Sequence, residues 1–83
     1  MSEMITDRIR QFIVDTFLYG DQGGVANSTS LTEAGIVDST GILELISFLE
    51  NEFSVTVEDD ELTPENLDSL ERLSRFITQK AAN

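Results

Sequence analysis

The chain has 83 residues, 40% of them apolar, and a formal net charge of −11. This length suits one domain, which we place at 1–83. The chain holds no cysteine and no histidine, so disulfides, thiol nucleophiles, the commonest general base and the commonest metal ligand are excluded. It also lacks the ~18-residue apolar run of a membrane span and the pattern of a signal peptide, so we expect a cytoplasmic protein.

The first periodic segment runs from about Glu3 to Leu18. Its apolar residues recur at helical spacing and predict one buried face. They are Ile5, Ile9, Phe12, Ile13 and Phe17. Gly20 is the expected stop. A long connection follows over 19–38, and we expect Leu31, Ile36 and Val37 to anchor it, with a turn at Gly35.

A second amphipathic helix is predicted from Ser39 to about Phe53. Its apolar face consists of Ile42, Leu45, Ile46, Leu49 and Phe53. Residues 54–57 alternate as in a strand but have no partner strand, which favours an extended link. Thr63 and Pro64 open a short helix. A capping box at 68–71 opens the last helix, whose apolar stripe is Leu70, Leu73, Phe76 and Ile77. The predicted fold is therefore all-α: a small four-helix bundle with three main helices, one short helix and a long first loop.

Charge is distributed unevenly along the chain. The five basic residues lie near the ends, and the segment 11–71 holds fourteen acidic residues and no basic one. Such a surface repels nucleic acid and anionic lipid and attracts basic partner proteins. Solubility alone would also explain it.

The segment 35–40, Gly-Ile-Val-Asp-Ser-Thr, adds a specific clue. An Asp-Ser pair that opens a helix after a long loop resembles the phosphopantetheine attachment motif of acyl carrier proteins. The resemblance extends over nearly the whole chain, because the helices, the acidic link and the ending PENLDSLERLSRFI follow in the family's order. By itself, Asp38-Ser39 would be no more than a helix cap.

The resemblance implies a carrier and not an enzyme. A phosphopantetheinyl transferase would supply Mg²⁺ and move 4'-phosphopantetheine from coenzyme A onto Ser39, while Asp38 would cap the helix. The arm's phosphodiester would then lie at a helix N-terminus, which favours an anion. Its terminal thiol would hold acyl or aminoacyl groups as thioesters, although the chain has no sulfhydryl of its own.

A competing match lies at 67–70, Leu-Asp-Ser-Leu, which is closer to the commoner form of the motif. Only fourteen residues follow Ser69, too few for the helices expected after an attachment site. A helix cap explains this second pair, so we favour Ser39.

The family often places an acid five residues after the serine to meet basic partner residues, and Glu44 holds that position here. We expect partner enzymes, including a loading ligase, to contact residues on and around this helix. The candidates are Thr40, Leu43, Glu44, Ser47 and Glu50. Thr40 replaces the usual Leu or Met, and Gly41 lies inside the predicted helix at a cost of about 1 kcal/mol relative to Ala. Together with the ending PENLDSLERLSRFI, these departures resemble specialised stand-alone carriers more than the fatty-acid carrier, while fatty acyl, specialised acyl and aminoacyl cargo all stay open.

The alternative is an unmodified acidic interaction module that binds a basic protein. It would not require Ser39. An acidic metal site at 58–61 is disfavoured because the run lacks EF-hand spacing. We expect a monomer that binds no nucleic acid.

Overall fold

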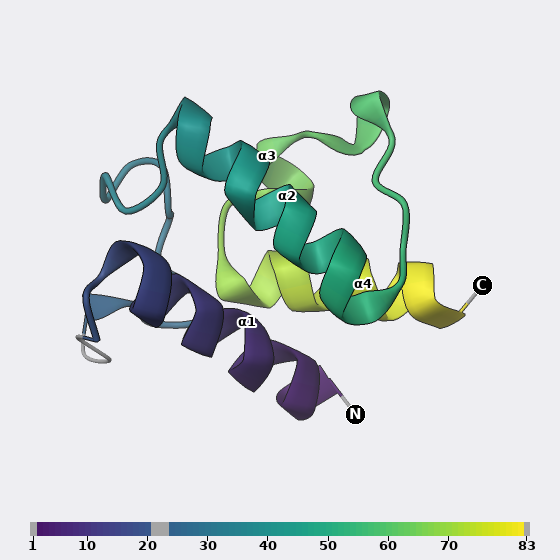
Figure 1. The fold of residues 1–83 in the computed structure, drawn as a ribbon, viewed down its shortest axis with the longest axis horizontal. Helices are drawn as coiled ribbons and strands as arrows, with labels where there is room; N and C mark the ends of the chain where they lie inside the picture. Colours follow the sequence, from purple (N-terminus) through teal and green to yellow (C-terminus); the bar gives the residue numbers. More distant parts are fainter. Residues whose placement is uncertain (1, 21–23, 83) are drawn as a thin grey trace.

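The computed structural model describes residues 2–20 and 24–82, and all regular elements within these ranges are helical. They are α1 (Ser2–Phe17), α2 (Ser39–Phe53), the 3₁₀ turn η2 (Asp59–Glu61), α3 (Pro64–Leu67) and α4 (Leu70–Ala82). Figure 1 shows the long connection from residue 24 onward leading to the start of α2, and the acidic link with η2 leading from α2 to α3. The three long helices and the short α3 agree with the predicted bundle.

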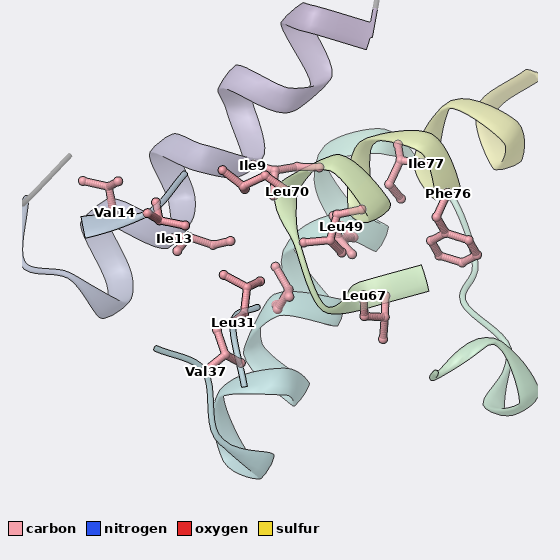
Figure 2. Close-up of a cluster of buried hydrophobic side chains, with 13 residues drawn as sticks. Ile9, Ile13, Val14, Leu31, Val37, Leu49, Leu67, Leu70, Phe76 and Ile77 are labelled. Carbon is pink, nitrogen blue, oxygen red and sulfur yellow. The ribbon is translucent and has the colours of Figure 1, made fainter. Parts of the chain in front are cut away.

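The core lies where α1, α2, α4 and the long connection meet. Figure 2 shows side chains from these segments pointing toward one another. The buried apolar residues are Ile9, Ile13, Val14, Val25, Leu31, Val37, Leu45, Leu49, Leu67, Leu70, Leu73, Phe76 and Ile77. All four residues of the predicted stripe of α4 are buried. The predicted faces of α1 and α2 also contain residues that are only partly buried, namely Ile5, Phe12, Phe17, Ile42 and Phe53. Burial of each Leu, Ile or Val side chain is worth about 1.5–3 kcal/mol and holds the helices together.

The long connection is held in place by its own buried residues and by a hydrogen bond from α1. Leu31 and Val37 are buried and Ile36 is half-buried, as predicted, while buried Val25 was not predicted. Arg10 of α1 donates to the Val25 carbonyl at 2.6 Å. The predicted turn occurs at Gly35, whose φ of +73° lies in the left-handed region. The predicted connection also included residues 21–23, which lie outside the described residues.

The helix ends differ in detail from prediction. α1 ends at Phe17 and is followed by two left-handed residues, Tyr19 and Gly20, of which only the glycine was expected. Thr63 occupies the cap position of α3, but its side chain makes no cap hydrogen bond. Residues 54–57 form an extended link, as predicted, with Val55 and Val57 half-buried.

The acidic run 58–61 folds into η2, which was not predicted. The Glu61 carboxylate accepts the Glu58 N–H at 2.9 Å, and the Glu61 N–H donates to the Glu58 carbonyl at 3.0 Å. Lys80 of α4 donates to Glu61 at 2.7 Å, and this hydrogen bond, followed by one from the Glu58 backbone, lowers the pKa of Glu61. Over the described residues no acidic group has the arrangement of a metal site. Likewise, none of the described helices combines the length and the apolarity needed to cross a bilayer.

Candidate attachment site

The Asp38-Ser39 pair lies at the junction between the long connection and α2. Asp38 is the N-cap: its backbone is extended, and its carboxylate accepts the Gly41 N–H at 2.7 Å. Its carbonyl accepts the Ile42 N–H at 2.9 Å, which is the first intrahelical bond. The predicted cap is confirmed, and it places Ser39 at the first helical position.

Ser39 is exposed, and its hydroxyl makes no hydrogen bond to any described residue. The N–H groups of Ser39 and Thr40 are also unpaired within the described chain, as expected in a first helical turn. A phosphodiester on Ser39 would therefore meet free N–H donors and the positive end of the helix dipole. The chain has no histidine that could act as a general base toward this hydroxyl.

Gly41 has a packing role that the sequence did not reveal. It is buried, and a Cβ added there would lie 2.8 Å from Cε1 of the Phe17 ring. The missing side chain lets the end of α1 pack directly against the first turn of α2. This contact fixes the position of the turn that carries Ser39.

The competing serine, Ser69, is in a different environment. It is only 5% exposed, and its hydroxyl accepts the Arg72 N–H at 3.1 Å as the N-cap of α4. The predicted capping box started instead at Asp68, so that assignment is wrong by one residue. Ser69 is therefore both buried and occupied as a helix cap.

The Asp68 carboxylate ties α4 to the long connection. It accepts the Ser30 hydroxyl, and its other oxygen accepts the Thr32 N–H at 3.0 Å and the Thr32 hydroxyl at 2.8 Å. The Asp68 carbonyl also accepts the Leu31 N–H at 2.8 Å. Partial burial raises the pKa of the Asp68 carboxyl, but the bonds from Ser30 and Thr32 outweigh it and hold that pKa below its usual value. The segment that leads to Ser39 is thus anchored from the opposite side of the fold.

Four of the predicted partner-contacting residues, Thr40, Leu43, Glu44 and Ser47, are exposed along α2. We call this set the α2 face. Leu43 is 66% exposed, which is unusual for a large apolar side chain on a helix. The fifth predicted residue, Glu50, is half-buried, and its carboxylate accepts the Val57 N–H at 2.9 Å. Glu50 thereby supports the extended link.

An apolar pocket of about 200 Å³ lies between α2 and the α3 region. Its walls include Ile42, which is one turn after Ser39, and the side chains of Leu62, Pro64 and Leu67. The pocket is open and has little polar surface, so it suits a small apolar group.

This chain is similar in sequence to known carrier proteins. The family described as "Phosphopantetheine attachment site" matches residues 7–77. The probable acyl carrier protein PigG of a Serratia species is 29% identical over 80 residues, covering 96% of this chain and 92% of PigG. An acyl carrier protein of Petrotoga mobilis is 32% identical over 74 residues, which cover 89% of this chain and 84% of the Petrotoga protein.

A solved structure has the same fold. It is the crystal structure of a Bradyrhizobium japonicum glycine:[carrier protein] ligase complexed with its cognate carrier protein and an analogue of glycyl adenylate. The matched chain superposes with a TM-score of 0.69 and is 27% identical, covering 94% of this chain and 96% of that one. The match therefore extends over nearly the whole chain.

Proposed function

Because the chain belongs to the phosphopantetheine attachment site family, and is thus a carrier of acyl or aminoacyl thioesters and not an enzyme, we propose that Ser39 bears its phosphopantetheine arm. The observation that carries this proposal is the exposed, unbonded hydroxyl at the capped N-terminus of α2. A transferase can reach that hydroxyl without unfolding any element. Ser69, by contrast, would have to leave its buried cap.

The bound arm would supply a thiol, and the residues of this chain would hold and present it. The free N–H groups of the first turn would receive the phosphodiester. Gly41 and Asp38 would hold that turn in place through the Phe17 contact and the cap. The chemistry of loading and transfer would belong to the partner enzymes.

We further propose that the α2 face is where those enzymes dock. An exposed leucine beside an acidic and a hydroxyl side chain offers an apolar contact, a charge and hydrogen-bonding groups within one helical face. Glu50 would act indirectly, by holding the 54–57 link. The expected partners are a phosphopantetheinyl transferase, a loading ligase and downstream processing enzymes.

For the cargo, we propose a small aminoacyl or short acyl group loaded by a ligase. Two observations support this choice. One is the likeness to a chain from a glycine:[carrier protein] ligase complex. The other is the small volume of the apolar pocket near Ser39, about 200 Å³, which supports the short acyl group.

The test is intact-protein mass spectrometry after incubation with coenzyme A, Mg²⁺ and a broad-specificity phosphopantetheinyl transferase. The wild type and Ser69→Ala should gain one phosphopantetheine group, and Ser39→Ala should gain none. A gain that survives Ser39→Ala would refute the assignment of the site. No gain in any variant, with the transferase active on a control carrier, would contradict modification and revive the acidic interaction module.

A second assay separates cargo classes. The modified protein would be offered to purified glycyl and long-chain acyl ligases with ATP, and the thioester would be read by mass. Loading with glycine or a short acid, and not with a long-chain fatty acid, is the expected result. Preferential long-chain loading would overturn the cargo proposal while leaving Ser39 untouched.

A further inference from the structure

The apolar pocket between α2 and the α3 region also has polar lining residues. Besides its apolar walls, the described lining consists of Thr32, Thr63 and Asp68. Each of these three side chains carries an oxygen that accepts hydrogen bonds, and none of the described lining residues is basic. The pocket therefore offers acceptors, but no cation, to a group that enters it.

Thr63 has a hydroxyl that the fold does not use. It occupies the cap position of α3, yet its side chain makes no cap hydrogen bond and bonds to no other described residue. The residue is half-buried. An occupant of the pocket displaces water from such a hydroxyl, so an occupant that bonds to it is favoured over one that does not.

The Asp68 carboxylate has room for one more donor. A carboxylate offers about four acceptor positions. Three of them are used, by the Ser30 hydroxyl and by the N–H and hydroxyl of Thr32. All three donors are neutral, and no described basic side chain forms an ion pair with Asp68. Arg72, the nearest basic residue in the sequence, donates to the Pro64 carbonyl at 3.1 Å.

These acceptors distinguish an aminoacyl group from a neutral acyl group of the same shape. An α-aminoacyl thioester carries an ammonium on the carbon next to the thioester carbonyl. The ammonium has a positive charge and three N–H donors, so it bonds to a hydroxyl and a carboxylate together. A methyl group in its place would fill the same space and leave both acceptors without a bond.

We propose that this pocket recognises the aminoacyl form of the cargo, with the α-ammonium bonded to Thr63 and Asp68 and a small apolar side chain against Ile42 and Leu67. The inference rests on the proposed carrier function, because the occupant is the end of the arm on Ser39. Ile42 is one helical turn after Ser39, so the arm reaches the pocket by folding back on itself. Thr63 and Asp68 thereby determine specificity for a small neutral amino acid.

The test compares two cargoes of the same shape, alanyl and isobutyryl, which differ by an ammonium in place of a methyl group. Each is joined to the arm through an amide instead of a thioester, so that neither hydrolyses. A broad-specificity phosphopantetheinyl transferase installs each loaded arm on Ser39 from the matching coenzyme A analogue. NMR shift changes at Ile42, Thr63 and Leu67, relative to the arm without cargo, report the docked fraction. The docking equilibrium constant should be at least about threefold larger for alanyl than for isobutyryl.

Thr63→Val keeps the shape of the side chain and removes its hydroxyl. Because that hydroxyl makes no bond to any described residue, the fold should be unchanged. The variant should lower the alanyl constant about threefold and leave the isobutyryl constant as it was. Thr56→Val, the same change at an exposed threonine of the 54–57 link, should alter neither constant. Asp68→Asn should abolish the preference, but it also weakens the loop anchor, so Thr63→Val is the deciding variant.

Equal docking constants for the two cargoes, a preference for isobutyryl, or equal effects of Thr63→Val and Thr56→Val would each overturn the proposal. Intact-protein mass spectrometry of the same samples separates this result from the carrier assignment. A protein that carries the loaded arm on Ser39 and shows no preference contradicts the pocket alone. A protein that gains no arm contradicts the carrier function, and this inference with it.

Discussion

Replacing Gly41 by alanine tests whether the α1–α2 contact positions the start of α2. In an ordinary exposed helix, Gly→Ala stabilises by about 1 kcal/mol, because glycine loses more backbone freedom on folding. Here the added Cβ would lie 2.8 Å from Cε1 and 3.3 Å from Cζ of Phe17. The closest ring atom must move by about 0.6 Å (3.4 − 2.8) to reach ordinary van der Waals contact.

Phe17 cannot yield without disturbing its neighbour. Its ring contacts Phe12 edge to face, with centroids 6.0 Å apart. Overpacking of this kind costs about 1–3 kcal/mol, which exceeds the gain in helix propensity. We therefore expect Gly41→Ala to lower the free energy of unfolding by about 1 kcal/mol.

The assay is urea unfolding followed by circular dichroism, in a double-mutant cycle with Phe17→Leu. The leucine removes the ring atoms that the new Cβ would meet. In that background Gly41→Ala should become neutral or stabilising by up to about 1 kcal/mol. An equal effect of Gly41→Ala in both backgrounds would refute the packing argument, and a stabilising effect in the wild type would show that the ring moves at little cost.

Three further predictions concern the frame around the site. Asp68→Asn should lower the free energy of unfolding by about 2 kcal/mol at pH 7, because it weakens charged hydrogen bonds to residues 30–32. Because folding lowers the Asp68 pKa, the contribution of the carboxylate is complete at neutral pH and is lost as the pH falls through the folded pKa, so wild type and variant should converge in urea titrations in acid, below that pKa. Ser69→Ala should cost about 1 kcal/mol through loss of the cap, measured in the same way, and an unchanged midpoint would contradict the capping role. Leu49→Ala should cost about 2–5 kcal/mol, because the side chain is fully buried among α1, α2 and α4, and a thermal midpoint within two degrees of wild type would argue against the described core.

Much of the fold follows from local patterns in the sequence. Apolar residues at helical spacing identify α1, α2 and α4, because a helix must bury one face. Asp38 and Pro64 mark helix starts through capping and through a fixed φ. These signals depend on neighbouring residues alone, which is why they can be found without a structure.

Contacts between distant segments could not be predicted in this way. The Asp68 carboxylate could serve as a helix cap or as an anchor for a loop, and only the approach of residues 30–32 decides between them. From the sequence alone, Gly41 is a residue that lowers the stability of α2. Its close contact with the Phe17 ring is visible only in the structure. Phe12 was assigned to the core by its spacing, but its ring also lines a surface groove.

The same limit applies to the candidate site. The Asp-Ser pattern occurs twice, and the argument from position favoured Ser39. Burial of Ser69 adds an independent physical reason for that choice. Of the candidate partner contacts, Glu50 differs from the rest because it is half-buried and one of its carboxylate oxygens accepts the Val57 N–H.

The bond from Leu31 to Asp68 also has a consequence for motion. Figure 1 draws the segment before Ser39 as an irregular trace, but its Leu31 N–H donates at 2.8 Å to the carbonyl of Asp68, the C-cap of α3. The Leu31 N–H, which is buried and bonded, should therefore exchange with solvent as slowly as the N–H groups at the centre of α4. A phosphopantetheine arm on Ser39 would then move by rotation about its own single bonds, because its attachment point is fixed. The distance that its thiol can reach would be set by the length of the arm.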